Sequence, residues 1–257
     1  MFSCSIYFAG LEWVLLAAAF TWLCSLKLRD VSIVDSLWSL LFLLLAWYFA
    51  VASGHWTPRV QLMLGLVTVW GLRLSIYITW RHRGQPEDHR YRAIRARNEP
   101  NFAFKSLYLV FALQALLAWI ISLPLFGAAS GGGTLGAGDL VGVALWALGF
   151  FFEAVGDWQL ARFKADDANR GRVMDRGLWR FTRHPNYFGE FCQWWGFYAI
   201  ALAAGAWWSI VGPLLMSVML LRVSGVTLLE KDIGDRRPKY ADYRKRTPAF
   251  FPGWRRH

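Results

Sequence analysis

The residues best suited to chemistry lie where a basic stretch meets an apolar, Trp-rich one. Arg176–His184 is rich in cations, and Asn186 and Glu190 follow it at the start of the apolar segment. Residues four apart share one face of a helix, and a carboxylate inside a membrane helix is costly unless it has a partner or a function. A basic loop that leads into a helix also suits phosphate. The pattern predicts a site for an anionic cofactor at a membrane boundary.

Further ionisable side chains lie inside apolar segments upstream. Asp35 stands one turn into such a segment and is expected to face the protein interior, as a functional carboxylate or as a buried hydrogen-bond partner. Arg73 and Tyr77 share a helix face, and the Tyr77 phenol could donate or relay a proton. Arg73 needs a carboxylate or a polar cavity, for which Asp35 and Glu153 are the candidates.

A pair of carboxylates, Glu153 and Asp157, also lies four residues apart, with Gly156 between them. Such a pair can bind a metal, act as acid and base, or accept hydrogen bonds from hydroxyl and amide groups. No histidine stands at ligand spacing, so we expect no metal site.

Two basic features lie towards the C-terminus. Arg222 is a cation deep in the last apolar run, where a phosphate or a carboxylate such as Glu190 would offset its cost. The segment Tyr240–Pro252 mixes aromatic and basic residues, which suits the bilayer surface or the cover of a cofactor pocket.

The composition indicates an integral membrane protein. Of 257 residues, 56% are hydrophobic, 16 are Trp and 18% are charged, with a mean hydropathy of +0.31; soluble chains carry about 25% charged residues. The net charge of +11 fits a basic cytoplasmic face and anionic lipid better than nucleic acid. The first apolar stretch has no basic residue before it and is followed by Lys27 and Arg29, so we expect a retained span rather than a signal peptide.

Seven apolar stretches are long enough to cross a membrane, which predicts an all-α, polytopic fold. Lys and Arg concentrate in the loops after odd-numbered spans and in the tail, so the N-terminus is expected outside and the C-terminus in the cytoplasm. The uncharged, Gly-rich loop 128–138 is expected to be flexible and to face outward. We predict a single domain over 1–257, with spans at about 6–26, 32–53, 60–80, 104–126, 139–163, 187–206 and 207–229 and a tail over 230–257.

Four segments together resemble those of a known family. Asp30-x-Ser-Ile-Val-Asp35-x-x-Trp38, Trp70-Gly-Leu-Arg-Leu74, Trp80-Arg-x-Arg-Gly84 and Gly177-Leu-Trp-Arg-x-Thr-Arg-His-Pro-Asn-Tyr-Phe-Gly-Glu190 are similar to the DUF1295 family, a branch of the steroid 5α-reductase superfamily. The similarity covers nearly the whole chain. It implies a seven-helix membrane oxidoreductase that uses NADPH to reduce the Δ4 double bond of a 3-oxo-steroid. Because the chain has neither a GxGxxG nor a GxxxxGK[ST] motif, neither a Rossmann nor a P-loop domain would hold the nucleotide.

The resemblance also assigns roles to individual residues. Tyr77 stands where steroid reductases keep the tyrosine that hydrogen-bonds the 3-keto oxygen, and we assign catalysis to Tyr77 and Asp35. Substrate contacts are assigned to Trp38 and Arg73. The resemblance assigns cofactor-binding roles to Asp157, Arg172, Asn186, Glu190 and Arg222, and to these we add Glu153, Glu230 and Tyr243.

The chain departs from the reductase pattern at several of these positions. The Gln-Glu pair of the reductases' second helix is missing, and Asp35 is its nearest substitute. Their asparagine on the fifth helix is Glu153 here, their tyrosine beside Arg172 is Gly171, and Glu230 stands near their tail tyrosine. These departures leave the cofactor half of the site better supported than the steroid half.

The implied reaction transfers hydride from NADPH to the β-carbon of an enone. Tyr77, polarised by Asp35 directly or through water, would stabilise the enolate oxygen. We expect a monomer in the membrane, in the bacterial inner membrane, that takes a lipid-like substrate from the bilayer and NADPH from the cytoplasm. Nucleic acid is not expected as a partner.

Two alternatives stay open. Arg183-His-Pro-x-Tyr187 with Glu190 also resembles isoprenylcysteine carboxyl methyltransferases and phospholipid methyltransferases, which bind S-adenosylmethionine. The segments around Asp35 and Tyr77 and the seven spans favour the reductase. A lipid-binding or structural membrane protein would use its intramembrane charges only to pair with one another.

Overall fold

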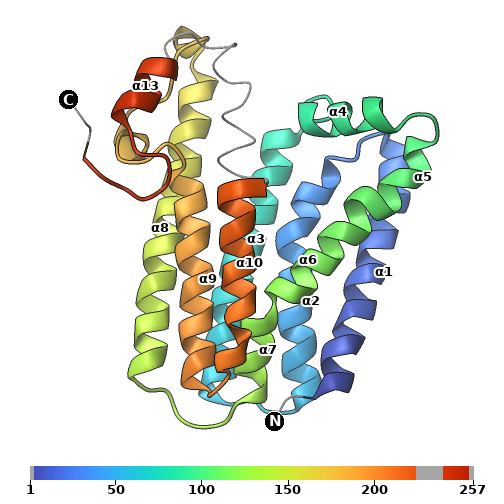
Figure 1. Cartoon of the computed structure of the whole chain (residues 1–257), viewed down its shortest axis with the longest axis vertical. Coiled ribbons are helices and arrows are strands. Elements are labelled where there is room, and N and C mark those ends of the chain that lie inside the picture. The colour runs from blue at the N-terminus through green and yellow to red at the C-terminus, as the bar shows by residue number, and fades with distance from the viewer. Residues whose placement is uncertain (1–2, 224–239, 255–257) are drawn as a thin grey trace. The chain divides into compact units, whose positions relative to one another are not determined.

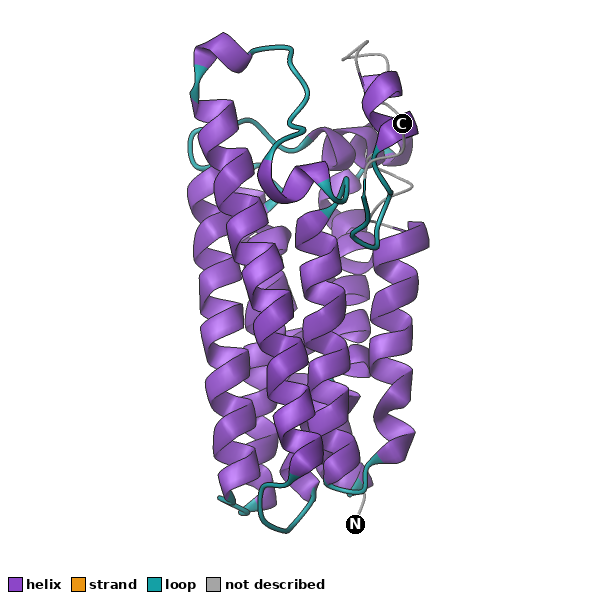
Figure 2. Ribbon diagram, turned by 90° about the vertical axis from the view of Figure 1, so that its left-hand side faces the viewer, coloured by secondary structure: helices purple, strands orange, loops and turns teal. Residues whose placement is uncertain are grey.

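The computed structural model describes residues 3–223 and 240–254 (Figure 1). Helices make up most of this part of the chain and it contains no β-strand (Figure 2), which confirms the predicted all-α class. Within the single domain that the sequence predicts, the chain forms two compact units. The first comprises residues 1–136 and 200–211, and the second comprises residues 137–199 and 212–257.

The first unit is built on three long apolar helices, α1 to α3. At 1.5 Å per residue, their 25, 21 and 25 residues are enough to cross a hydrocarbon core about 30 Å thick. Gly54 ends α2 at a φ of 67°, and Thr57 caps α3 by accepting a hydrogen bond from the backbone N–H of Val60. In chain order the helices are α1 (Cys4–Leu28), α2 (Ile33–Ser53), α3 (Pro58–His82), α4 (His89–Asn98), α5 (Phe102–Ser106), the π-helical η1 (Leu107–Ala112), α6 (Leu113–Ile121), α7 (Leu123–Ser130) and η4 (Trp207–Ile210).

Helices α2 and α3 approach closely through small residues. The Ser39 hydroxyl donates to the Gly71 carbonyl at 2.8 Å. A Cβ atom added at Gly71 would lie 3.2 Å from the Ser39 carbonyl oxygen, so a larger residue would push the two backbones apart. The buried rings of Phe42 and Trp70 pack beside this contact, with centroids 5.8 Å apart.

Arg59 fastens the loop that follows α7. Its side chain is only 3% exposed and donates to the carbonyl oxygens of Gly132 and Thr134 at 2.6 and 2.8 Å. The Gly-rich loop that the sequence predicts to be flexible is therefore held by a buried guanidinium, and its first residues belong to α7.

The second unit pairs two apolar helices through glycines. A Cβ added at Gly149 would meet the Gly189 carbonyl and lie 2.8 Å from the backbone nitrogen of Gln193; one added at Gly196 would lie 2.7 Å from the Gly142 carbonyl oxygen. Because the glycines recur every seven residues, they follow one face of each helix and bring the backbones together. The helices of this unit are α8 (Ala137–Ala165), η2 (Asp167–Asn169), η3 (Gly177–Arg180), α9 (Pro185–Ala203, whose last residues belong to the first unit), α10 (Val211–Val218), the π-helical η5 (Met219–Val223) and α13 (Tyr240–Arg246).

Five of the seven predicted spans are confirmed as helices long and apolar enough to cross a membrane: α1, α2, α3, the continuous helix Phe102–Ile121, and α8. The sixth corresponds to α9, with 19 residues, and the seventh to the shorter apolar helical segment Trp207–Val223. The rest of span 207–229 lies outside the described residues. The count of seven and the orientation stay predictions.

The glycine contact yields a stability prediction. Gly149→Ala should lower the free energy of unfolding by about 1–3 kcal/mol, because the new methyl group meets backbone rather than a flexible side chain. The matched control is Gly65→Ala on α3, where a Cβ meets nothing within 4 Å; it should be neutral or stabilising by up to about 1 kcal/mol. Thermal unfolding in mild detergent measures both, and equal unfolding midpoints would contradict the close packing.

Candidate functional site

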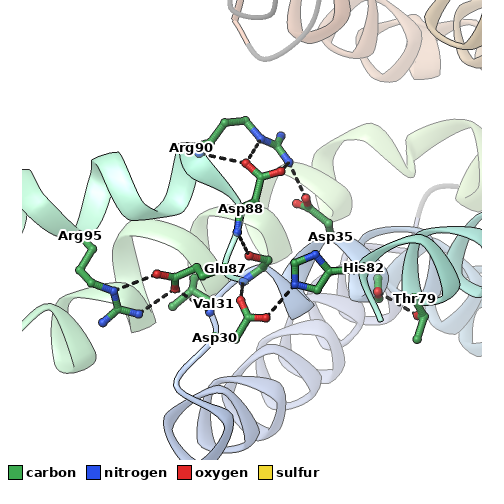
Figure 3. Close-up of polar contacts among 11 residues, drawn as sticks. Asp30, Val31, Asp35, Thr79, His82, Glu87, Asp88, Arg90 and Arg95 are labelled. Carbon is green, nitrogen blue, oxygen red and sulfur yellow. Dashed lines mark hydrogen bonds and ion pairs between the residues drawn. The ribbon is translucent and has the colours of Figure 1, made fainter. Parts of the chain in front are cut away.

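Asp35, in the first turn of α2, binds two side chains of α4. Its Oδ2 accepts from Nη2 of Arg90 at 2.6 Å, and its Oδ1 accepts from the Tyr91 hydroxyl at 2.5 Å. Figure 3 shows the Asp35 carboxylate directed at Arg90. Asp35 thus joins the start of α2 to a helix more than fifty residues later in the chain.

Asp88 strengthens this contact from the other side of Arg90. Its Oδ1 accepts from Nε and from the backbone N–H of Arg90 at 3.0 and 2.9 Å, which also caps α4. Burial alone would lower the pKa of Arg90, but the Asp35 charge and the Asp88 hydrogen bond raise it, so the guanidinium stays charged. Burial and the Asp35 charge raise the pKa of Tyr91 well above its usual value, which keeps its phenol neutral and able to donate.

A second set of contacts holds the loop around the first. Asp30 Oδ2 lies 2.8 Å from His82 Nε2, and Glu87 accepts from the Val31 N–H at 3.0 Å and from Arg95 at 2.7 Å (Figure 3). Burial would raise the pKa of Asp30, but hydrogen bonds from His82 and the Ser32 residue next to Val31 outweigh it and lower the pKa. The loop between the third and fourth predicted spans, expected from the sequence only to be rich in Lys and Arg, therefore covers the α1–α2 turn.

Tyr77 and Arg73 lie on a different face of α3 from the one that meets α2. Ser75 and Thr79 donate to the backbone carbonyl and the hydroxyl of Ser36, at 2.8 and 2.9 Å. At about 100° per residue, Tyr77 is turned well away from these two positions, towards the side of Arg73. Its ring lies 6.1 Å from Trp80 and 5.5 Å from the Arg81 Cζ. Since both Asp35 oxygens are engaged by α4, the contacts favour a role for Asp35 in holding that helix rather than in polarising Tyr77.

Trp38, predicted to contact substrate, is half-buried on α2. Its ring packs edge-on against Phe42, with centroids 5.0 Å apart. This contact fixes the indole against the core of the first unit.

The second unit carries polar side chains on the facing surfaces of α8 and α9. Glu153 is 2% exposed, Asp157 4% and Glu190 9%. Gln193, fully buried, donates from Nε2 to Glu153 Oε2 at 2.5 Å. Gln193 lies one turn beyond Glu190 and two beyond Asn186, on one face of α9. Gln193 was not predicted from the sequence because it carries no charge, although its spacing from Asn186 and Glu190 could have indicated it.

The basic motif before α9 binds the C-terminal tail. Nη1 of Arg183 donates to the carbonyl oxygens of Arg244 and Thr247 at 3.0 and 2.6 Å, and its backbone N–H donates to Pro248 at 3.0 Å. The Thr182 hydroxyl, buried beside it, donates to the Phe250 carbonyl at 2.8 Å. We call these bonds the motif–tail contact.

His184, the next residue of the motif, is also buried. Its ring stacks on Tyr187, with centroids 5.5 Å apart and an interplanar angle of 7°. Much of the motif that the sequence assigned to a cofactor therefore also holds the tail and packs the start of α9.

The motif–tail contact places Tyr243 over a basic pocket. The Tyr243 hydroxyl donates to the Trp179 carbonyl at 2.5 Å, and the Trp179 indole donates to the Gly156 carbonyl of α8 at 3.0 Å. The resulting pocket, of about 330 Å³, unites Arg172 and Tyr243, both predicted as cofactor residues. Its other lining residues are Phe163, Asn169, Val173, Asp175, Arg176 and Arg246. We call it the polar pocket.

The remaining predicted positions lie apart from this pocket or outside the description. Arg222, expected to be deep in an apolar run, is exposed on η5. Glu230 lies outside the described residues. No three His, Cys, Asp or Glu side chains of residues 3–223 and 240–254 gather at metal-binding distance.

Comparison with known proteins places most of the chain in one family. The model of a family described as "Protein of unknown function (DUF1295)" matches residues 21–247. An uncharacterized protein of Schizosaccharomyces pombe, C594.04c, is 26% identical over 268 residues, which cover 90% of this chain and 75% of the yeast protein. No solved structure matches significantly.

The Asp35 contact can be tested through Tyr91. Tyr91→Phe removes the donor to Oδ1 of Asp35 and should lower the free energy of unfolding by about 1–3 kcal/mol, because a partly buried carboxylate loses a hydrogen bond. Tyr108→Phe, at an exposed position on η1, is the control and should change it by less than about 0.5 kcal/mol. If thermal unfolding in detergent ranks the two variants equally, Tyr91 does not stabilise Asp35.

Proposed function

The chain belongs to the DUF1295 family, and we propose that it is an NADPH-dependent membrane reductase of a 3-oxo-Δ4-steroid or a similar lipid enone. The observation that carries the proposal is the polar pocket, which unites Arg172, assigned to the cofactor by the resemblance, with Tyr243 of the tail and two further arginines. The resemblance to steroid reductases supplies the reaction. The protein would act as a monomer in the bacterial inner membrane, with NADPH entering from the cytoplasm.

The lining of the polar pocket fits the phosphate end of a dinucleotide. The pocket contains three planar, charged guanidinium groups, whose paired N–H donors suit phosphate oxygens. They belong to Arg172, Arg176 and Arg246. The rings of Phe163 and Tyr243 offer apolar faces against which a base could stack. A volume of about 330 Å³ lies at the low end of the roughly 300–1,000 Å³ typical of ligand pockets, which suits part of a dinucleotide rather than the whole.

The buried polar face of α8 and α9 would serve the rest of the cofactor. Glu153, Asp157 and Glu190 are acceptors for hydroxyl and amide donors, whereas Asn186 offers both functions. The Gln193 amide, which holds Glu153, would fix the direction in which that carboxylate accepts. Such preorganised groups orient a ligand without the cost of ordering flexible side chains.

The chemistry on the substrate side falls to the first unit. NADPH, when bound, would supply the hydride that the enone accepts at its β-carbon, and a proton from water would complete the reduction at the α-carbon. The Tyr77 phenol would donate a hydrogen bond to the enone oxygen and stabilise the negative charge that develops there. The Arg81 guanidinium, whose Cζ lies 5.5 Å from the centroid of the Tyr77 ring, would add positive charge near the phenol. Arg73 and Trp38 would contact the substrate. Asp35 would act indirectly, by positioning α4 through its bond to Arg90.

Cofactor binding is the first test. Thermal-shift titration of the purified chain should show stabilisation by NADPH, and Arg172→Ala should weaken NADPH binding roughly 10- to 100-fold, the loss expected for one charge-assisted hydrogen bond. Arg170→Ala, an exposed arginine outside the polar pocket, should leave the affinity unchanged. NADH lacks the 2′-phosphate of NADPH, so the difference between the two titrations measures how much that phosphate contributes to binding. Stabilisation by S-adenosylmethionine alone would overturn the reductase in favour of a methyltransferase.

Turnover is the second test. If the substrate is a 3-oxo-Δ4-steroid, progesterone should drive NADPH oxidation, and Tyr77→Phe should lower kcat by about 100-fold or more while NADPH affinity stays unchanged. Tyr48→Phe, a tyrosine on α2 at the opposite end from Asp35, should retain normal turnover. Full activity of Tyr77→Phe would remove Tyr77 from the mechanism, and absence of progesterone-dependent oxidation would refute the steroid as substrate.

A further inference from the structure

The second unit contains another basic pocket, of about 450 Å³, with a different lining. Three cations, Arg183, Arg244 and Lys245, lie beside apolar side chains of Leu221, Phe250 and Phe251. No acidic side chain is among the described residues that line it. We call it the amphiphilic pocket, because its lining suits a ligand with an anionic group and a hydrocarbon part.

Its position in the fold matches the depth of lipid headgroups. Arg183 lies two residues before Pro185, where the 19-residue apolar helix α9 begins. At 1.5 Å per residue α9 is about 28 Å long, close to the thickness of a hydrocarbon core, so Arg183 stands at one edge of that core. Leu221 belongs to η5, near the end of the described apolar segment Trp207–Val223. Phe251, 60% exposed, has the placement of an aromatic side chain at a membrane interface.

The cations of this pocket are positioned to bind an anion. Arg183 is fixed by the carbonyl oxygens of Arg244 and Thr247, so one wall is preformed. Among the described residues, Lys245 forms an ion pair with Asp242 at 4.0 Å, in which both side chains are largely exposed. Exposed pairs of this kind contribute little stability, so the Lys245 ammonium can bind another anion.

The two basic pockets of this unit differ in the ligands they suit. The polar pocket carries Asn169 and Asp175, which can bond to hydroxyl and amide groups, whereas the amphiphilic pocket offers aromatic and aliphatic surface in their place. On α13, Tyr243 and Arg246 face the polar pocket, whereas Arg244 and Lys245 line the amphiphilic one. Charge complementarity, apolar lining and depth together favour one occupant.

We propose that the amphiphilic pocket binds the headgroup phosphate of an anionic phospholipid, with Arg244 and Lys245 as its charged contacts and Phe250 and Phe251 against the acyl glycerol. The proposal does not depend on the reductase activity. Each basic residue near a membrane surface contributes roughly a fivefold gain in affinity for anionic lipid, so loss of two should weaken binding about 30-fold.

The experiment is a lipid titration of the full chain in detergent, followed by native mass spectrometry and thermal unfolding. Phosphatidylglycerol should bind and stabilise the wild type, and phosphatidylcholine, which has the same chains but no net charge, should do so far less. The double variant R244A/K245A should bind phosphatidylglycerol about 30-fold more weakly. Both side chains are exposed, so the fold should survive their removal. The control R97A/R170A removes the same charge from exposed positions outside the pocket and should bind normally.

Three other outcomes would each overturn the lipid proposal in a recognisable way. Equal weakening in both double variants would mean general attraction to surface charge. Equal stabilisation by glycerol 3-phosphate would assign the pocket to a soluble phosphate. Loss of NADPH stabilisation in R244A/K245A with phosphatidylglycerol binding intact would assign it to the cofactor. NADPH binding that fails in the wild type while phosphatidylglycerol binding behaves as expected would refute only the reductase.

Discussion

The fold depends on one constraint: polar groups in or beside a hydrocarbon core have no water and must find partners within the protein. Asp35 is bound by Arg90 and Tyr91 of α4, Arg59 by two carbonyl oxygens of the loop after α7, and Glu153 by Gln193 of α9. In each case the partner comes from a distant part of the sequence. Satisfying the polar group therefore also fixes which segments pack together, and the same contacts that remove a desolvation cost define the architecture of each unit.

How much of this the sequence could predict follows from how local each signal is. Five of the seven predicted spans are confirmed as membrane-length apolar helices, because hydropathy and length are local properties of the sequence. The span predicted at 32–53, for example, corresponds to the helix Ile33–Ser53. A partner for Asp35 was also predicted, but the residues expected from the sequence were Arg73 and Tyr77, near the end of α3 in the same hairpin. The partners that the structure shows lie in α4, a polar helix. No periodicity in its sequence indicates that this helix packs back onto the start of α2. Gln193 was not predicted for a different reason. Its amide is uncharged, so its place in an apolar helix does not indicate a high desolvation cost as a buried charge would.

The basic motif before α9 shows why a sequence motif can be recognised correctly and still be assigned too narrowly. Its cations were interpreted as ligands for an anion. In the structure, however, the Arg183 guanidinium donates hydrogen bonds to carbonyl oxygens of the tail, and the Thr182 hydroxyl donates to the Phe250 carbonyl. Any effect of these two residues on cofactor binding would therefore be indirect. By fixing the tail, these residues bring Tyr243 beside Arg172, which lie about seventy residues apart in the chain. Glycines make the arrangement possible, because α8 and α9 approach closely enough for Glu153 and Gln193 to meet.

The short helix α13 links the two basic pockets of the second unit. Tyr243 and Arg246 are three residues apart and share one face, whereas Arg244 and Lys245 lie between them and point elsewhere. One turn of helix thus completes a pocket suited to a nucleotide phosphate and another suited to a lipid phosphate. A ligand that holds one face of α13 also reduces the freedom of the other, and the second ligand then meets a helix already ordered. If both pockets fill as proposed, the membrane's anionic lipid would act on cofactor affinity through this helix, with no contact between the two ligands.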